Sequence, residues 1–597
     1  MKFEELSDEQ QLFIKYGVAG HNILVEACIG SGKTTAIQAL CNAIKGKNIL
    51  YLTYNKLLKL DAKARILNGR TIVTNYHGFA WQELRRANIR SGISELIQVY
   101  NRSDLPVGSY DVLILDEYQD IDQEISEMLL HIKEKRPNIQ IVAVGDMCQK
   151  IYDKTTLDVS EFITDFLGQY VPMEFTKCFR LGADHAAMLG RVWEKKIVGV
   201  NKNFRIDVVP DYRAQVIAAN TEPKDLLVLG SRGKAATKLQ NYLEKQYPEK
   251  FNKQTLWSKI TDTDGGTTSP DPSCAIFTTY DGCKGMERKI CILYDWSLKY
   301  WMTRAEKPDV RYEILRNIFC VAASRGKERL VIVDTGDPID EDILCEPFLT
   351  RYQYTDMQAS TMFDFKLVEH VEAAYKLLNV EVLDESGEPI NIPTADALID
   401  LSPCVGHYQE AMYFENYSID SDIEKALSQP ANSHLRRGYD KYDLSRKLLY
   451  LAALDTGQNR YMNQVKDLRV TPELEQKLKE RLALYLKPDE TVQTDSQIKF
   501  MTEFEEDLFT VNGRSDVSRE NEIWELKFVA ELSHVHALQL AMYLIGEGKE
   551  TGYLWNTRTG ERHKITIPNR KKFLTAVGKA VTKGRHKRTK QEIIPCA

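Results

Sequence analysis

The sequence predicts an α/β fold with two parallel-sheet domains, followed by a third α/β domain of a different pattern. Three observations support this prediction. A chain of 597 residues is too long for one hydrophobic core. Short β-branched runs alternate with helical patterns through the first 335 residues, which is typical of parallel sheets flanked by helices. After about residue 345 the pattern changes to helices, a strand-rich stretch from about 498 to 528, and helix again.

The boundaries of the expected domains follow from these patterns. The first domain, at residues 1-170, has expected strands at Ile23–Glu26, Asn48–Thr53, Thr71–Thr74, Val112–Leu115 and Ile139–Val144. The second, at residues 171-345, has expected strands at Leu226–Leu229, Ala275–Thr278, Ile290–Tyr294 and Leu330–Val333. Residues 346-390 are expected to form a linker, and residues 391-597 the third domain with a basic tail.

The composition excludes several classes of protein. With 43% hydrophobic and 27% charged residues, the chain resembles globular proteins rather than disordered or fibrous ones. No apolar run approaches the ~20 residues of a membrane span, so no membrane partner is expected. The acidic N-terminus MKFEELSDEQ does not have the order of a secretory signal. We therefore expect a cytoplasmic location, or a nuclear or host-cytoplasmic one for a eukaryotic or viral protein.

The cysteines and the net charge restrict metal and nucleic-acid binding. The 11 cysteines are scattered without CxxC spacing, so reduced thiols and no iron–sulfur cluster are expected. A net charge of −6 does not attract a polyanion to the whole molecule, so nucleic acid would bind in local grooves. The basic run that begins at Arg570 is either a solvated face or a nucleic-acid arm.

A glycine-rich loop connects the first expected strand to a helix. The segment Ala27-Cys-Ile-Gly-Ser-Gly-Lys-Thr-Thr35 follows the strand and precedes a helical pattern, which is the context of a phosphate-binding P-loop. Backbone N–H groups at the start of the helix would bind the phosphates of ATP. Lys33 would neutralise the β and γ phosphates, and the Thr34 hydroxyl would hold Mg²⁺. The expected ATP-binding residues of this loop are Gly30, Ser31, Gly32, Lys33, Thr34 and Thr35.

Two acidic residues follow the strand at Val112–Leu115. A buried strand of an open α/β sheet delivers side chains to its carboxyl end, where ligands bind. We expect Asp116 to hold Mg²⁺ and Glu117 to orient and deprotonate the attacking water.

The ordered motifs of the first 330 residues resemble those of superfamily 1 helicases of the UvrD type. The matching segments are Leu6–Gln10, Leu52–Lys56, Thr74–Phe79, Val144–Tyr152, Phe175–Arg180, Thr279–Glu287 and Val321–Arg325. The resemblance implies two RecA-like P-loop domains that close on ATP. It assigns roles at the nucleotide as follows: Gln10 reads adenine, Gln149 senses the γ-phosphate, Arg180 contacts phosphate, Glu287 lies near the ribose, and Arg325 is the arginine finger. It implies contacts with single-stranded DNA by Asn55, Tyr76, His77, Phe79 and Lys284.

The spacing departs from the family pattern at two places. Only about 40 residues separate Thr74 from Asp116, and about 100 separate Arg180 from Thr279, where UvrD-like enzymes usually have large insertions. We therefore expect a motor with reduced accessory subdomains. Tyr76, Phe79 and Trp81 are candidates for stacking on bases, although at least one of them is expected to be a core residue.

A second candidate site lies in the expected third domain. The segments Val511–Val517 and Glu522–Val529 have strand patterns and are joined by a polar turn at Arg519–Asn521. If Val517 pairs with Trp524, Asp516 lies opposite Glu525 with Cβ atoms ~5 Å apart. Two carboxylates at that distance repel each other unless a divalent cation lies between them. Lys527 projects from the same sheet face, because the strand period is two.

These residues resemble the PD-(D/E)XK nucleases of the RecB type. Gln539 and Tyr543, spaced i,i+4 on an expected helix at Val535–Ile545, complete the motif. The resemblance implies a restriction-endonuclease-like domain in which Asp516, Glu525 and Lys527 are catalytic, with Asp516 and Glu525 as ligands of Mg²⁺ or Mn²⁺. It implies that Gln539 and Tyr543 contact nucleic acid. Glu503 or Glu505 is a candidate for a further ligand, and His407 or Glu410 for the upstream motif.

The function expected from the whole sequence is an ATP-dependent DNA helicase-nuclease. It would translocate on single-stranded DNA, 3′ to 5′ by the family resemblance, act on single-stranded and tailed duplex DNA, and cleave DNA at a metal site. Two alternatives remain open: a helicase motor with an inactive, DNA-gripping C-terminal domain, and an ATP-gated nucleic-acid-binding scaffold. The sequence does not identify whether there is a protein partner.

Overall fold

The computed structural model describes most of the chain, and its residues form two compact units. The described residues are 3–54, 66–92, 95–231, 235–259, 270–307, 309–348, 354–391, 399, 401–429, 432, 438–466, 468, 470–501 and 508–584. Unit 1 comprises Met1–Val209, Tyr280–Trp301 and Arg311–Pro347, and unit 2 comprises Pro210–Thr279, Met302–Val310 and Phe348–Ala597. Within the described ranges, no helix is both long and apolar enough to span a membrane.

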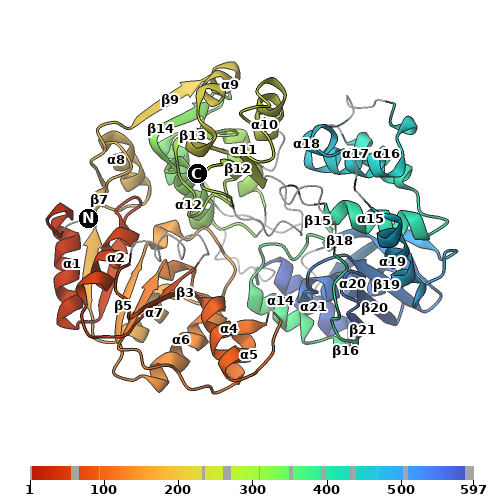
Figure 1. The fold of residues 1–597 in the computed structure, drawn as a ribbon, viewed down its shortest axis with the longest axis horizontal. Coiled ribbons are helices and arrows are strands. Elements are labelled where there is room, and N and C mark those ends of the chain that lie inside the picture. Colours follow the sequence, from red (N-terminus) through yellow and green to blue (C-terminus); the bar gives the residue numbers. More distant parts are fainter. Residues whose placement is uncertain are drawn as a thin grey trace. The chain divides into compact units, whose positions relative to one another are not determined.

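The N-terminal part of unit 1 is built on a six-stranded parallel sheet with the order β3-β2-β4-β5-β1-β6. Its strands are β1 (Ile23–Ala27), β2 (Ile49–Thr53), β3 (Thr71–Asn75), β4 (Val112–Asp116), β5 (Gln140–Gly145) and β6 (Val171–Phe175). Its helices are α1 (Asp8–Ala19), α2 (Lys33–Ala43), α4 (Tyr76–Arg86), α5 (Leu96–Arg102), α6 (Gln123–Lys135) and α7 (Val159–Leu167). This arrangement confirms the predicted α/β fold with parallel strands for this part of the chain (Figure 1).

Alternate residues of the central strands pack on opposite faces of this sheet. Val112 and Ile114 of β4 pack in the cluster that contains residues of α1 and α2. Leu113 and Leu115 pack in the cluster that contains residues of α4, α5, α6 and α7. The strand period of two therefore gives β4 two buried faces, which explains its unbroken apolar run. Asp116, the next even-numbered residue, is delivered to the α1–α2 side.

The rest of unit 1 follows the same α/β pattern. Strands β13 (Arg288–Leu293), β14 (Gly326–Val333) and β9 (Arg205–Val209) are parallel neighbours in that order. The short strands β7 (Lys177–Cys178) and β8 (Val198–Gly199) pair with each other. The helices are α8 (Ala183–Val192), the deeply buried α12 (Tyr312–Ala323) and α13 (Glu341–Cys345), while α11 (Leu298–Ala305) crosses the boundary between the units.

Unit 2 contains a small parallel α/β part and a larger mixed sheet. The first part has strands in the order β11-β12-β10, at Leu256–Lys259, Ala275–Thr279 and Leu226–Gly230, with helices α9 (Asp211–Asn220) and α10 (Ala235–Gln246). The mixed sheet has the order β15-β18-β19-β20-β21-β16, and β17 pairs with β18. Its strands are β15 (Tyr354–Gln358), β16 (Asn379–Asp384), β17 (Val492–Met501), β18 (Leu508–Ser518), β19 (Glu522–Lys527), β20 (Thr551–Asn556) and β21 (Arg562–Thr566).

Some helices of this part of unit 2 share a core cluster with the mixed sheet, and the others do not belong to that cluster. Three pack on it through one large core cluster: α14 (Val368–Tyr375), α20 (His534–Gly546) and α21 (Arg570–Val581). The others are α15 (Ser402–Tyr413), α16 (Ile419–Ser428), α17 (Leu444–Thr456), α18 (Arg460–Asn463) and α19 (Pro472–Ala483). The residues expected as a linker, 346-390, contain β15, α14 and β16, and both strands belong to the mixed sheet.

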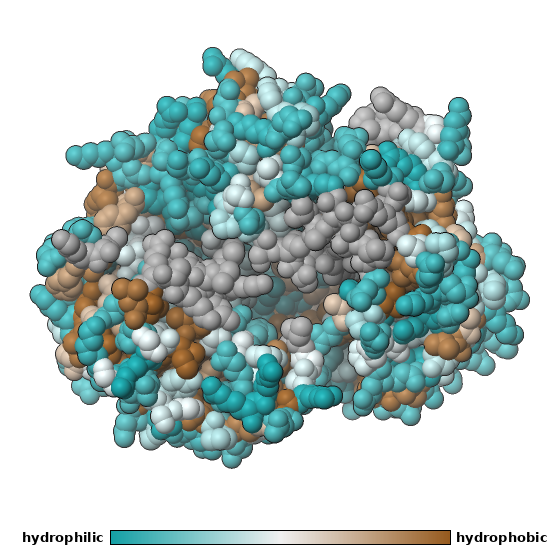
Figure 2. Space-filling view, viewed as in Figure 1, coloured by the Kyte–Doolittle hydropathy of each residue, from teal (hydrophilic) through white to brown (hydrophobic). Residues whose placement is uncertain are grey.

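Because most apolar side chains are buried in these cores, a mainly hydrophilic surface is expected. The face drawn in Figure 2 is mainly hydrophilic, with separate hydrophobic patches. Isolated exposed apolar side chains are normal for a folded protein, because polar residues are too few to cover its whole surface.

Candidate functional site

The glycine-rich loop has the backbone geometry that phosphate binding requires. It follows β1, and α2 begins at Lys33. Gly30 and Gly32 have φ angles of 68° and 77°, in the left-handed region that favours glycine. A Cβ atom on Gly30 would lie 2.7 Å from the Cβ of Arg180, so a side chain does not fit there. The loop therefore presents backbone atoms rather than side chains at the start of the helix.

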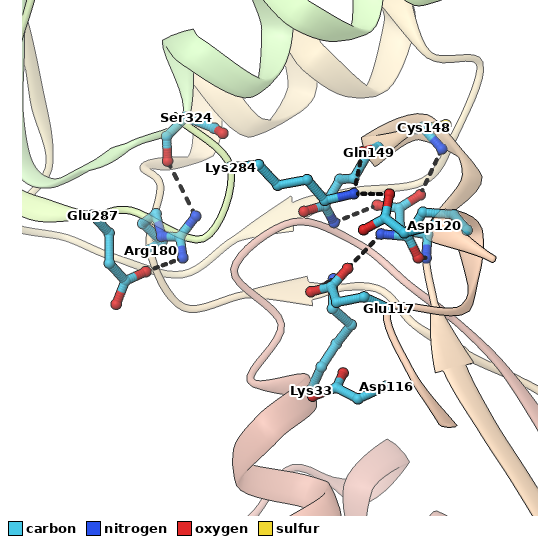
Figure 3. A network of polar contacts seen from close by, with 12 residues as sticks. Lys33, Asp116, Glu117, Asp120, Cys148, Gln149, Arg180, Lys284, Glu287 and Ser324 are labelled. Atoms are coloured by element: carbon cyan, nitrogen blue, oxygen red, sulfur yellow. Dashed lines mark hydrogen bonds and ion pairs between the residues drawn. The ribbon is translucent and has the colours of Figure 1, made fainter. Parts of the chain in front are cut away.

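Lys33, Asp116 and Glu117 meet beside this loop (Figure 3). The Nζ atom of Lys33 lies 3.3 Å from Oε1 of Glu117, and both side chains are largely buried. Asp116 is fully buried, and its Oδ2 accepts a hydrogen bond of 2.7 Å from the hydroxyl of Tyr51. Its Oδ1 is buried without a hydrogen-bond partner in the described structure. Such a carboxylate oxygen fits a divalent cation, since buried anionic oxygens are otherwise costly.

The two neighbouring carboxylates have opposite pKa shifts. Burial, and then the charge of Glu117, raise the pKa of Asp116 above its ordinary value. Burial also disfavours the charged form of Glu117, but Lys33 and Lys284 outweigh it and lower the pKa of Glu117. Glu117 has a left-handed φ of 59°, which is uncommon outside glycine and is often found at functional sites. Its side chain accepts a hydrogen bond from the amide of Gln119.

A second group of polar side chains lies around Lys284, Asp120 and Gln149 (Figure 3). Lys284 lies 2.6 Å from Oδ1 of Asp120 and donates a hydrogen bond of 2.9 Å to the backbone oxygen of Gln149. The side-chain amide of Gln149 donates to Oδ2 of Asp146 at 2.8 Å. The charge of Lys284 is thus compensated inside the protein, so the predicted contact of Lys284 with nucleic acid would require this ion pair to open.

The predicted arginines also lie in unit 1. Arg180 pairs with Glu287 and donates a hydrogen bond of 3.2 Å to the backbone oxygen of Ser324. Arg325 is 4% exposed, and its Nε donates to the backbone oxygen of Val321 at 2.9 Å. Burial lowers the pKa of Arg325, as does nearby Arg180, whereas Glu287 and Glu117 raise it. Arg325 is therefore buried near the acidic side chains of the site and does not face solvent.

The side chain of Gln10 is engaged by the loop itself. Its amide nitrogen donates a hydrogen bond of 2.9 Å to the backbone oxygen of Ser31, and its Oε1 accepts one of 3.1 Å from the Ser7 N–H. Phe179 was not selected from the sequence. It is 46% exposed, and a Cβ atom on Gly32 would lie 4.0 Å from its ring. The signal in the sequence is an aromatic residue directly before Arg180, in the segment matched to the fourth motif.

The structure corrects part of the predicted nucleic-acid contact. Tyr76 and Phe79 are 2% and 1% exposed and lie in the core cluster between the sheet and α4–α7, so they are not available for stacking. They are buried because α4 turns this face toward the sheet. Trp81 is 46% exposed, with the guanidinium of Arg85 5.0 Å from its ring centroid. His77 is exposed, and Asn55 lies outside the described residues.

Unit 2 brings together the carboxylates predicted from the third domain. The β18–β19 hairpin pairs Val517 with Trp524, the register that the prediction requires. Oδ2 of Asp516 accepts a hydrogen bond of 2.6 Å from the backbone N–H of Leu526. The Nζ atom of Lys527 lies 2.9 Å from Oε1 of Glu525, which is 2% exposed. Oε2 of Glu525 is buried without a hydrogen-bond partner among the described atoms.

Helix α20 supports this cluster from one side. The side-chain amide of Gln539 donates hydrogen bonds to Oε1 of Glu525 at 3.0 Å and to the hydroxyl of Tyr543 at 2.9 Å. Both side chains are buried, at 6% and 2% exposure. The structure therefore places Gln539 against the catalytic candidate Glu525, and Tyr543 behind Gln539, rather than at an open nucleic-acid surface.

A further carboxylate, Glu410 of α15, belongs to the same group. Burial and then the charges of Asp516 and Glu525 raise its pKa well above the ordinary value. Burial and Asp516 likewise raise the pKa of Glu525, while these carboxylates keep Lys527 charged by raising its pKa against the effect of burial. His407 instead is exposed, and its Nδ1 lies 2.8 Å from the Tyr417 hydroxyl. Of the two upstream candidates, Glu410 therefore interacts with the cluster.

A metal site at this cluster would need ligands beyond its side chains. Glu503 and Glu505 lie outside the described residues. Across the part of the chain that the structure describes, no group of three or more His, Cys, Asp or Glu side chains is arranged to hold a metal ion. Mg²⁺ commonly uses one or two protein carboxylates and completes its octahedron with water and substrate phosphate. The partnerless Oε2 of Glu525 fits that mode of binding.

Comparison with known proteins adds a family match for the N-terminal part. Residues 10–155 match a model described as an AAA domain. No curated protein matches the chain. One similar solved structure is an S. cerevisiae Dbp5 variant bound to Gle1 and IP6, with 12% identity over 57% of this chain and 85% of that chain and a TM-score of 0.36. Another is an Arterivirus nonstructural protein 10 helicase with DNA, with 13% identity over 56% of this chain and 65% of that chain and a TM-score of 0.30. A third shows Pif1 helicases at forked duplex DNA, with 14% identity over 57% of this chain and 94% of that chain and a TM-score of 0.30. All three TM-scores are below 0.5.

Proposed function

We propose that this protein is an ATP-dependent nucleic-acid helicase. The observation that supports the proposal most directly is the buried ion pair of Lys33 and Glu117 beside Asp116, whose Oδ1 has no hydrogen-bond partner among the described residues. A cation, a base and a metal-holding carboxylate next to a glycine loop are the parts that phosphoryl transfer to water requires. The AAA-domain match covers all of these residues.

The polar contacts of the site suggest how its side chains act during hydrolysis. Lys33 would exchange its ion pair with Glu117 for the triphosphate, which frees Glu117 to orient a water molecule and accept its proton. Asp116 and Thr34 would hold Mg²⁺, which neutralises phosphate charge when bound. Arg180 and Arg325 would add positive charge to the transferring phosphoryl group. Phe179, exposed beside the loop, would cover the adenine base in place of the contact predicted for Gln10.

Unwinding is tested by strand displacement on tailed duplexes. We expect ATP-dependent displacement of DNA by the wild type, with 3′ to 5′ polarity from the family resemblance. Lys33→Ala and Arg325→Ala should each abolish displacement, and Arg325→Ala should retain nucleotide binding because Lys33 and the loop remain. Hydrolysis of ATP without displacement of DNA or RNA would contradict the helicase proposal and favour an ATP-gated nucleic-acid-binding scaffold.

We further propose that unit 2 contains a metal-dependent nuclease. Asp516, Glu525 and Lys527 have the residue types and spacing of such a site, and Gln539 orients Glu525. Mg²⁺ or Mn²⁺ bound there would polarise the scissile phosphate. Lys527 would stabilise developing phosphorane charge, and Glu410 is a candidate for a third carboxylate ligand.

Cleavage of single-stranded and tailed DNA tests this second proposal. Asp516→Asn should abolish cleavage, because it removes a metal ligand while preserving side-chain volume. Glu381→Gln, an exposed carboxylate on β16 of the same sheet, is the matched control and should leave cleavage unchanged. Cleavage that survives Asp516→Asn would contradict the assignment. No cleavage by the wild type with either metal would favour the alternative of a C-terminal domain that only grips DNA.

A further inference from the structure

We propose that Tyr51 is a positioning residue that fixes Asp116 for the divalent cation of the nucleotide site. Its hydroxyl donates a hydrogen bond of 2.7 Å to Oδ2 of Asp116, and this contact is buried. The other oxygen, Oδ1, has no hydrogen-bond partner in the described structure. One oxygen of the carboxylate is thus held by the protein, and the other is left for a ligand. The inference rests on the proposed ATP-hydrolysing function and assigns a residue that the motifs do not include.

The sheet explains how Tyr51 reaches Asp116. Strands β2 and β4 are parallel neighbours, with Tyr51 paired to Ile114. Ile114 and Asp116 are two residues apart, so their side chains and that of Tyr51 project from the same sheet face. The phenol ring is completely buried in the core cluster beneath α2, which begins at Lys33. The ring is therefore held by packing, and its hydroxyl is directed along the sheet to the carboxyl end of β4.

The protonation state of Tyr51 fits a fixed donor. A tyrosine phenol, with an ordinary pKa of about 10, is neutral at neutral pH. A neutral phenol has one O–H donor, and here it points to Oδ2. This hydrogen bond prevents rotation of the carboxylate, so that only Oδ1 of Asp116 can face a cation. Partners that orient a metal ligand in this way typically contribute 10–100-fold to metal affinity or activity.

The substitution Tyr51→Phe isolates the hydroxyl. It preserves the ring and its packing and removes only the donor to Asp116. The matched control is Tyr100→Phe in the same unit, because Tyr100 is equally buried and its hydroxyl has no hydrogen-bond partner in the described structure. We expect Tyr51→Phe to raise the Mg²⁺ concentration that half-saturates nucleotide binding by about 10–100-fold. Tyr100→Phe should leave it unchanged.

The experiment is a Mg²⁺ titration of fluorescent ATP-analogue binding to the full chain. Affinity without Mg²⁺ should be the same in both variants and the wild type, since Lys33 and the loop are untouched. Equal Mg²⁺ dependence of Tyr51→Phe and wild type would overturn the proposal. If the proposed function itself is wrong, the result differs from this one: the wild type would then show no nucleotide binding, or none that depends on Mg²⁺.

A second measurement separates positioning from general stability. The rise in unfolding temperature on adding Mg²⁺ and the ATP analogue is compared with each variant's own value without ligand. We expect this rise to be smaller for Tyr51→Phe than for Tyr100→Phe and wild type, even if both variants have lower unfolding temperatures. Equal rises in all three proteins would show that Tyr51 only fills the core.

Discussion

Asp116 and Glu117 are neighbours in sequence, yet their surroundings give them different tasks. Asp116 ends a buried strand and has a raised pKa, and its Oδ1 has no hydrogen-bond partner in the part of the chain that the structure describes. Glu117 follows in a left-handed backbone conformation, and its side chain pairs with Lys33. The charges of Lys33 and Lys284 outweigh the effect of burial and lower the pKa of Glu117. A pair of carboxylates with separated pKa values is typical of sites in which one residue binds a cation and the other accepts a proton.

The carboxylates of unit 2 predict a specific pH dependence. Burial, and then the charge of Asp516, raise the pKa values of both Glu525 and Glu410, and Glu525 raises that of Glu410 further, so folding favours their protonated forms. Without metal, their contribution to stability is complete below the ordinary pKa near 4.3 and is lost as the pH rises through the raised values. A divalent cation must displace these protons, so its affinity should increase with pH.

Mn²⁺ binding measured calorimetrically between pH 6 and 8 checks this dependence. We expect affinity to rise about 10-fold per pH unit for each proton displaced, with proton release into the buffer. The variant Glu525→Gln should lose most of the pH dependence together with the binding. Mn²⁺ affinity that does not change with pH would show that these carboxylates do not bind the ion.

At the scale of elements, the sequence predicted the buried strands well and the edge strands poorly. Strands β2, β4 and β10 are buried along their whole length, and their sequences contain continuous apolar runs that predict buried strands. Strands β9 and β16 are largely exposed, so their patterns lack such a run. Their existence depends on pairing with partners distant in sequence, at Arg329–Val333 and Arg562–Thr566. Single-sequence patterns do not contain that information.

The same limit applies to the sites. The glycine loop, the two acids after β4 and the β18–β19 hairpin are local patterns and were predicted. The Tyr51–Asp116 hydrogen bond joins residues 65 positions apart, and the Lys284–Asp120 pair joins residues 164 apart, so neither is visible in a local motif. The burial of Tyr76 and Phe79 depends on how α4 packs, which the motif does not determine.

The substitution Gly513→Ala tests whether the close contact of strand β18 with helix α20 positions the side chains of the site. A Cβ atom there would lie 2.4 Å from Cε1 of Tyr543, whose hydroxyl accepts from Gln539. Gly513→Ala should displace Tyr543 and, through Gln539, Glu525. We expect a loss of stability of about 1–3 kcal/mol from overpacking, together with reduced cleavage of DNA. Urea denaturation and a cleavage assay measure the two effects, and Gly69→Ala, which points into open space, is the control. Unchanged cleavage by a folded Gly513→Ala variant would contradict this coupling.

At the scale of the whole molecule, unit 2 combines segments far apart in sequence. Arg460 of α18 pairs with Glu244 of α10 at 2.6 Å and donates a hydrogen bond of 2.9 Å to the backbone oxygen of Leu256. Both charged side chains are almost fully buried, at 4% and 6% exposure. The helical region between β16 and β17 is therefore joined to the small α/β part by a buried polar contact that local sequence patterns do not reveal.

Removing one partner of this buried pair should destabilise the protein strongly. We expect Arg460→Ala to lower the free energy of unfolding by about 3–5 kcal/mol, because Glu244 would remain buried without its cation. Lys479→Ala removes a half-exposed i,i+4 pair with Glu475 and should change stability by less than about 1 kcal/mol. Urea denaturation of the full chain compares the two variants. Equal effects would show that the Arg460–Glu244 contact does not hold the two parts of unit 2 together.

The proposed hydrolysis requires Glu117 to activate water beside a triphosphate held by Lys33 and the glycine loop. The most direct measurement is the rate of ATP hydrolysis, with single-stranded DNA present, by wild type, Glu117→Gln and the exposed control Glu134→Gln on α6. We expect Glu117→Gln to bind Mg²⁺ and ATP but to hydrolyse ATP at least about 100-fold more slowly, as for loss of a general base, while Glu134→Gln should equal the wild type. Hydrolysis by Glu117→Gln at the wild-type rate would contradict the role of Glu117 as the base.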